Sequence, residues 1–292
     1  GNFHGTVPFE LSQFAGAYGD TYNPVSLLLR PTRKAPRFNV NAITYAEYDI
    51  LEDLTFKSSF SLDLWNWSDR TFSPRAPEIG RPSNMNYLDQ SAGNSTRWIW
   101  DQQLNYNKTF GRHNLGLTAV YTAQFRKEES HSFTVQDFDR EDDWFQYPGN
   151  ANTILNVPGY SAFEDALTSA IGRATYDFDD RYFIMGSIRR DQTSRLAPST
   201  RTDFFPAVSG AWKISSESFF HSNLIDLLKF RASWGQVGNI SSVGYYAFNV
   251  PMSAGNNVIL GDPGERNRHI SLNEITNANL KWERSETLNL GL

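Results

Sequence analysis

The 292-residue chain contains no cysteine and no long apolar run, and its net charge is small. The absence of cysteine excludes a disulfide framework and thiolate chemistry. No stretch approaches the roughly 18 consecutive apolar residues that a membrane-spanning helix requires. A formal net charge of -5 provides no basic surface of the kind that binds nucleic acid, so we expect no nucleic-acid partner.

Recognisable catalytic and metal-binding motifs are missing as well. The five histidines share no metal-ligand spacing, and no G-x-S-x-G nucleophile elbow occurs. We therefore expect that the protein is not an enzyme and needs no cofactor. One acidic cluster could gather oxygen ligands around calcium, although it lacks the glycine turn of an EF-hand loop. It consists of Asp137, Asp139, Glu141, Asp142 and Asp143.

What the chain does contain is a repeated alternation of apolar and polar residues. In residues 38–50 the even positions are mostly apolar, from Phe38 and Val40 to Tyr48 and Ile50, whereas most odd positions are polar. Successive side chains of a strand lie on opposite faces, so this segment predicts a strand with one apolar and one polar face. The same pattern predicts about nine strands, near 37–50, 54–67, 96–109, 114–127, 167–177, 181–193, 203–214, 227–236 and 280–292.

The connections between these strands alternate in length. Tight reversals are expected at 51–54, 110–113 and 177–180, whereas the long connections are 68–95, 128–166 and 237–279. Tight turns at one end of the strands and long loops at the other are typical of a transmembrane β-barrel. Two stretches, 160–167 and 215–228, could instead form short helices.

The polar faces favour a barrel over a soluble sheet. Asn, Gln, Arg, Lys and Asp on every predicted strand suit a hydrated lumen, and aromatics near strand ends, such as Trp98, Trp212 and Trp234, suit girdles at the membrane interfaces. The predicted fold class is all-β: an antiparallel transmembrane β-barrel with short periplasmic turns and long outer loops. A passive porin, a barrel enzyme and a secreted β-sandwich binding module stay open as alternatives.

Several motifs, in order along the chain, resemble SusC/RagA-type TonB-dependent transporters. The strongest is LKFRASWGQVGN at 228–239. The others are GRATYD at 172–177, RRDQTSR at 189–195, FPAVSGAWKIS at 205–215 and NLKWE at 279–283. Together these motifs are specific, because they follow the order of the family over most of the chain.

The resemblance implies an outer-membrane protein of a Gram-negative bacterium that crosses the membrane many times as a barrel of about 22 strands around a plug. It implies active import of oligosaccharides or peptides, energy coupling through TonB–ExbB–ExbD, and a SusD-like surface lipoprotein as a lid, besides contact with outer-membrane lipid. No plug, TonB box or signal peptide is recognisable in the sequence. We therefore expect residues 1–292 to form one part of the barrel domain, with the plug and the remaining strands elsewhere.

Two groups of residues are candidate functional groups. Exposed loop aromatics can stack on sugar rings, pack against a lid protein, or fold back on their own loops; these are Trp144, Phe145, Tyr147, Tyr245 and Tyr246. Four charged residues, Arg189, Arg190, Asp191 and Arg195, are expected to form an ion network near the outer rim. Lys229 and Arg231 are expected to face the lumen and to pair with acidic plug residues, with substrate binding as the alternative.

Overall fold

A computed structural model describes residues 28–75, 84–156, 158–222, 224–249, 252–259, 266–272 and 277–292. Nearly all of its regular structure is β-strand, with two single-turn 3₁₀ helices, η1 (Pro148–Asn150) and η2 (Ile214–Ser216). The strands are β1 (Thr32–Lys34), β2 (Arg37–Leu51), β3 (Leu54–Ser73), β4 (Tyr87–Phe110), β5 (His113–Phe138), β6 (Ala151–Ile154), β7 (Gly159–Phe178), β8 (Tyr182–Thr193), β9 (Thr202–Lys213), β10 (Lys229–Asn239), β11 (Met252–Ile259), β12 (Arg266–Leu272) and β13 (Glu283–Gly291).

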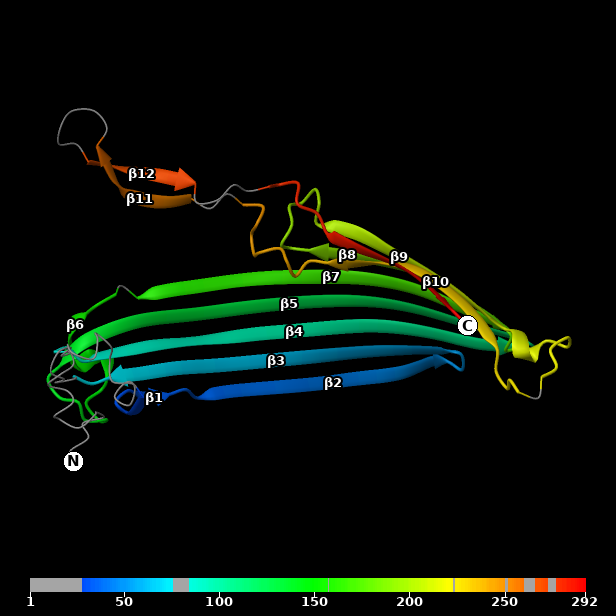
Figure 1. The fold of residues 1–292 in the computed structure, drawn as a ribbon, viewed down its shortest axis with the longest axis horizontal. Helices are drawn as coiled ribbons and strands as arrows, with labels where there is room; N and C mark the ends of the chain where they lie inside the picture. Colours follow the sequence, from blue (N-terminus) through cyan, green and yellow to red (C-terminus); the bar gives the residue numbers. More distant parts are fainter. Residues whose placement is uncertain are drawn as a thin grey trace. The chain divides into compact units, whose positions relative to one another are not determined.

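Sequential strands lie next to each other in one large sheet (Figure 1). Its order is β1-β3-β4-β5-β7-β8-β9-β10-β13, with β2 also paired to β3 and β6 also paired to β5. Strands β11 and β12 form a separate hairpin. The described registers are antiparallel. Within the described ranges, no helix has the length and apolar character needed to cross a membrane.

All nine predicted strands are confirmed, as β2, β3, β4, β5, β7, β8, β9, β10 and β13. The tight reversals are confirmed too, and Asp179 and Asp180 adopt positive φ angles of 60° and 53° in theirs. The loop boundaries were wrong. Strand structure occupies much of 68–95 and 128–166, where among the described residues only 74–75, 84–86, 139–150, 155–156 and 158 lie outside strands. Hairpin β11–β12 lies within the third long connection. Polar strands lack the apolar alternation, so the pattern could not reveal these extensions.

The two suggested helices are also wrong. Residues 160–167 belong to β7, which pairs with β5 and β8. A one- or two-turn helix gains too little from its own hydrogen bonds to compete with such ladders. In 215–228, the described residues contain only the end of η2.

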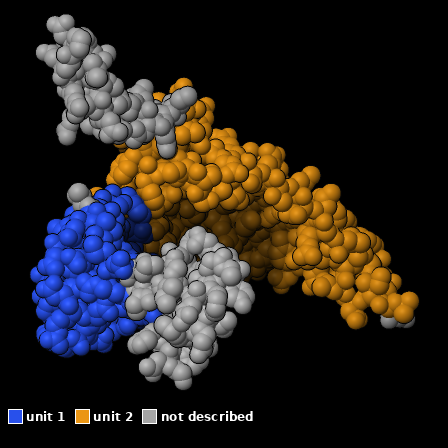
Figure 2. Space-filling model, turned by 60° about the vertical axis from the view of Figure 1, so that its left-hand side comes forward, with its two compact units in different colours: residues 1–41, 63–96, 127–163 blue, residues 42–62, 97–126, 164–292 orange. Residues whose placement is uncertain are grey.

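The chain divides into two compact units, coloured separately in Figure 2. Unit 1 comprises residues 1–41, 63–96 and 127–163, and unit 2 comprises 42–62, 97–126 and 164–292. Each contains a small buried apolar cluster. That of unit 1 is Phe72, Leu88, Val135 and Phe138, and that of unit 2 is Leu196, Phe205 and Trp282.

Most of the large apolar side chains of unit 2 lie outside its cluster, on one exposed face of the sheet. Ile184 of β8 is 60% exposed, and Leu288 of β13 is 68% exposed. The face continues from β8 to β9, because residues directly opposite each other in the register lie on the same face: Ile188 is opposite Pro206, and Gly186 is opposite Val208. A β-sandwich would bury such a face against a second sheet. The exposed face therefore excludes the β-sandwich alternative and fits a lipid-facing wall.

Two rows of aromatic rings cross this face. Near the tight turns, ring centroids are 4.9 Å apart for His113–Phe178, 6.4 Å for Phe178–Tyr182 and 6.5 Å for Tyr182–Trp212. Trp98 forms the second row, with its centroid 6.3 Å from Phe60 and 6.1 Å from Phe125. Trp98 and Trp212 were both predicted as girdle residues.

Another of the predicted girdle residues, Trp234, lies outside both rows. It is opposite Val208 in the register, and its Nε1 donates to Glu286 at 2.7 Å.

The spacing of the two rows matches the thickness of a membrane. From His113 to Phe125, β5 advances about 12 residues, which at about 3.3 Å per residue and a tilt of about 40° corresponds to about 30 Å along the membrane normal. The alternate residues between them are Leu115, Leu117, Ala119, Tyr121 and Ala123. Because β5 continues to Phe138, its last part lies beyond this apolar band.

Adjacent substitutions on β5 should have opposite consequences in the full-length protein. Leu117→Arg places a charge in lipid at a cost of about 2–4 kcal/mol, so its barrel should fail to assemble. Thr118 lies on the other face, where its Oγ1 donates to Asn105 at 3.2 Å, so Thr118→Arg should assemble nearly normally. Heat-modifiable mobility of membrane fractions on gels measures assembly. Equal yields for the two variants would contradict this assignment of faces.

Candidate functional site

A carboxylate beside the tight-turn end joins the aromatic row to the connection between β9 and β10. Glu217 accepts hydrogen bonds from Tyr182 Oη at 2.5 Å, Trp212 Nε1 at 3.0 Å and Arg181 Nη1 at 3.4 Å. The bonds from Tyr182 and Trp212 are the main reason that the pKa of Glu217 lies below its ordinary value. This carboxylate therefore fixes the start of the connection as long as it is ionised.

On the polar face of unit 2, Arg189 is bound by neighbouring side chains of the same face. Arg189 Nε donates to both carboxylate oxygens of Asp191 at 2.7 Å, and its Nη2 donates to Ser169 at 3.1 Å. Arg190 lies opposite Phe204 on the other face of β8 and donates to Gln192 at 3.2 Å. The expected single network is therefore wrong, because adjacent residues of a strand point to opposite faces.

Arg195 forms a second, separate cluster. It pairs with buried Asp165 at 3.3 Å, donates to the Val243 carbonyl at 3.2 Å, and lies 4.2 Å from the centroid of the Tyr245 ring. Both this cluster and the Arg189–Asp191 pair line a cavity of about 1010 Å³. Tyr245, in the connection after β10, is thus half-buried beside Arg195 and lines this cavity.

The other predicted loop tyrosine, Tyr246, is exposed and has a φ of 56°. Its hydroxyl oxygen accepts from the Glu164 backbone N–H at 3.3 Å, which ties this connection to the start of the β7 segment in unit 2.

Residues 139–150 of unit 1, named here the rim loop, carry the remaining aromatic candidates. Trp144 is 61% exposed and Tyr147 is 59% exposed, whereas Phe145 packs against the buried cluster of unit 1. The guanidinium of Arg140 lies 4.8 Å from the Trp144 ring, and that of Arg70 lies 5.3 Å from the Tyr147 ring. Two aromatic surfaces therefore face outward, each beside an arginine, while Phe145 anchors the loop.

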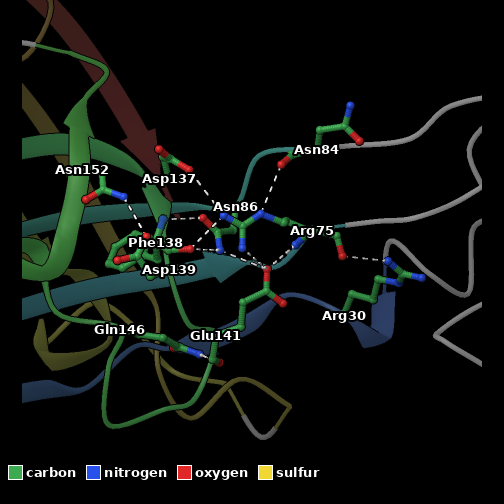
Figure 3. A network of polar contacts seen from close by, with 10 residues as sticks. All are labelled: Arg30, Arg75, Asn84, Asn86, Asp137, Phe138, Asp139, Glu141, Gln146 and Asn152. Carbon is green, nitrogen blue, oxygen red and sulfur yellow. Dashed lines mark hydrogen bonds and ion pairs between the residues drawn. The ribbon is translucent and has the colours of Figure 1, made fainter.

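A buried polar network holds the start of the rim loop (Figure 3). The side chain of Asn86 is fully buried; its Nδ2 donates to the Phe138 carbonyl and to Glu141, both at 3.0 Å, and its Oδ1 accepts from the Phe138 N–H at 2.7 Å. Arg75 also donates to the Phe138 carbonyl, at 2.8 Å, and its backbone N–H donates to Glu141 at 2.8 Å. Because every partner is satisfied, the network fixes one loop conformation.

The sequence pattern missed Asn86 and Arg75, which both lie within the predicted long connection 68–95. A single Asn and a single Arg in polar surroundings carry no periodic signal, and only the fold shows that Asn86 is buried.

The acidic residues proposed for calcium take separate partners. Asp137 pairs with Arg75 at 3.3 Å, and Asp139 accepts from Asn152 at 3.0 Å. The others, Glu141, Asp142 and Asp143, contact Arg75, Arg140 and Lys34 respectively. Within the described part of the chain, no group of three or more His, Cys, Asp or Glu side chains is arranged to hold a metal.

Lys229 and Arg231 occupy alternate positions of β10 and line a second cavity in unit 2, of about 1210 Å³. The Lys229 ammonium lies 4.1 Å from the centroid of the Phe183 ring, on the polar face of β8. Arg231 lies against Gly291 of the neighbouring strand. Both cations therefore face the side that the alternation predicts for the lumen.

Asn86→Ala should loosen the rim loop. It leaves the buried Phe138 N–H without its side-chain acceptor, at a cost of about 1–3 kcal/mol, and it removes one donor to Glu141, which keeps the bond from the Arg75 N–H. We expect faster proteolysis within 139–150 in the full-length protein, while the barrel stays assembled. Asn152→Ala removes one exposed bond to Asp139 and serves as the control; equal cleavage of the two variants would argue against the anchoring role of Asn86.

The contacts of Glu217 should depend on pH in one direction. A carboxylate with a depressed folded pKa contributes its stabilisation above its ordinary pKa of about 4.3 and loses it as the pH falls through the lower folded value. The amide-exchange protection factors of 214–222, which correct for the intrinsic pH dependence of exchange, should therefore be constant from about pH 8 to 5 and fall only below about 4. Glu217→Gln should remove this acid transition, and a transition at neutral pH would refute the assignment.

The comparisons with known proteins agree with this geometry. Residues 2–292 match the family model described as TonB dependent receptor-like, beta-barrel. TonB-dependent receptor P3 of Formosa agariphila is 31% identical over 281 residues, which are 94% of this chain and 27% of that protein. TonB-dependent receptor SusC of Bacteroides thetaiotaomicron is 32% identical over 168 residues, covering 56% of this chain and 17% of SusC. The chain thus spans about a quarter of the length of the first of these relatives.

Solved structures show the same fold. The structure of the RagAB peptide transporter superposes with a TM-score of 0.82 at 20% identity, covering 92% of this chain and 29% of that one. The "open-open" RagAB peptide importer gives the same TM-score at 21% identity. The SusC/RagA resemblance found in the sequence is confirmed, and members of this family are transporters and receptors, not enzymes. The chain belongs to the TonB-dependent receptor-like β-barrel family of the bacterial outer membrane.

Proposed function

We propose that the protein containing this chain actively imports an oligomeric nutrient, a glycan in preference to a peptide, together with a SusD-like surface lipoprotein. The observation that carries this proposal is the rim loop, which presents exposed Trp144 and Tyr147 on an anchored backbone. Rigid exposed aromatics supply contact area at a low entropic cost, and they suit both a sugar ring and a protein lid.

Family membership supports the remaining elements of the proposal. A TonB-dependent receptor takes its energy from the inner membrane, so TonB–ExbB–ExbD is the expected driving partner. RagAB is a peptide transporter, which keeps peptides within the proposed substrate class. The arginines beside Trp144 and Tyr147 can donate hydrogen bonds to sugar hydroxyls or to peptide carbonyls, so the rim loop by itself serves either substrate.

A passive porin is the alternative function. It would need no lid, and its outer loops would have no reason to hold an anchored aromatic surface. Purification of the native complex from membranes separates the two. Recovery of a surface lipoprotein with the barrel supports import, whereas a barrel recovered without a lipoprotein or a plug would favour a porin.

The rim loop should contribute directly to binding of the lid. The double variant Trp144→Ser and Tyr147→Ser removes both exposed rings, but it retains Phe138 and Phe145, which belong to the packed cluster. We expect at least a several-fold loss of co-purifying lipoprotein, because aromatic anchors dominate interfaces. Phe219→Ser, an exposed ring beside the tight turns, is the matched control. Unchanged recovery with the double variant would remove the rim loop from the interface.

A further inference from the structure

Three cations are grouped on the polar wall near the tight turns of unit 2. Lys229 of β10 lies directly opposite Lys213 of β9, and Arg231 follows two residues later on the face of Lys229. Like charges directly opposite each other on neighbouring strands destabilise a sheet. Among the residues that the structure describes, no carboxylate forms an ion pair with any of the three.

This arrangement differs from two other cation positions on the polar face of the sheet. Arg189 is paired with Asp191 at 2.7 Å, and Lys57 with Glu47 at 3.7 Å. The wall thus supplies its own carboxylate at these positions. At the three grouped cations, the described strands supply no such paired carboxylate.

The two β10 cations, Lys229 and Arg231, line the cavity of about 1210 Å³, and neighbouring residues hold them there. The Lys229 ammonium lies over the Phe183 ring, with Nζ 4.1 Å from the ring centroid, in a cation–π contact. A Cβ on Gly291 would lie only 2.8 Å from Arg231 Nε, so this glycine leaves room for the guanidinium. Ser209, Ser233 and Asn289 line the same cavity. Its two other charged lining residues, Asp177 and Lys108, are bound elsewhere, Asp177 by Asn114 at 3.0 Å and Lys108 by Asp53.

We propose that Lys213, Lys229 and Arg231 form an anion subsite on the lumen wall that receives the carboxylate or sulfate groups of an acidic oligomeric substrate. The subsite rests on the proposed import function and specifies its substrate class. Lysine is a hydrated point charge that binds anions without a fixed geometry. That property suits a group that must bind and then leave, whereas a permanent partner would favour a bidentate arginine fork.

Lysine acetylation of the full-length transporter, read by mass spectrometry, tests the subsite without any substitution. The probes are oligogalacturonate for carboxylate, sulfated carrageenan oligosaccharide for sulfate, and neutral malto-oligosaccharide of equal length. We expect at least one acidic probe to slow acetylation of Lys213 and Lys229 several-fold, an effect that weakens at high salt. The neutral probe should change neither rate, and Lys57, already paired, should be insensitive to all three.

Two outcomes would overturn the proposal. Acetylation of Lys213 and Lys229 that is rapid and unchanged by every acidic probe leaves no anion subsite. Acetylation that is already slow in the substrate-free protein and insensitive to probes assigns the counter-ion to an acidic residue of the plug.

A variant gives a second readout. Lys229→Gln with Arg231→Gln should weaken binding of the protective probe by about tenfold for each charge-assisted hydrogen bond lost. Lys57→Gln should leave it unchanged, and equal affinities of the two variants would contradict the subsite. The lipoprotein should co-purify with both, so loss of the subsite alone stays distinguishable from failure of the import function.

Discussion

The fold depends on one requirement, that every backbone N–H and C=O inside hydrocarbon must find a partner within the protein. A continuous antiparallel ladder meets it for an all-β chain. Once the ladder exists, the alternation of side chains fixes one lipid face and one polar face, and no residue can change face without a slip of the register. The exposed band with Ile184 and Leu288, and the polar face with Arg189 and Lys229, are two results of the same ladder.

Beyond the apolar band, the requirement changes because water can satisfy the backbone. Strands there need not alternate, and side-chain contacts decide the structure. There, the hydrogen bonds of the Asn86–Arg75–Glu141 network and the packing around Phe138 hold the chain in place. This is why a loop rich in charge and aromatics holds one conformation and can present Trp144 and Tyr147 as a surface.

Two kinds of cation on the polar face differ in their partners. Arg189 and Arg195 are held by buried carboxylates of the same wall, and their desolvation cost is offset by that pairing. Lys213, Lys229 and Arg231 have no such carboxylate among the described residues. The first kind shapes the wall, and the second kind leaves positive potential in the lumen. In the proposed import function, an acidic substrate would use that potential, and the rim loop would contact the lid.

The sequence by itself determined the nine strands, their tight turns and the two faces, because alternation and turn residues are local signals. It also determined the family, through ordered motifs such as 228–239. Only the tertiary structure decided how far β3, β4 and β5 extend, that Arg190 is separated from Arg189 and Asp191, and that the acidic residues near 137–143 take separate partners. These outcomes depend on which strands lie side by side and at what register. Contacts between residues distant in sequence leave no periodic trace in the chain.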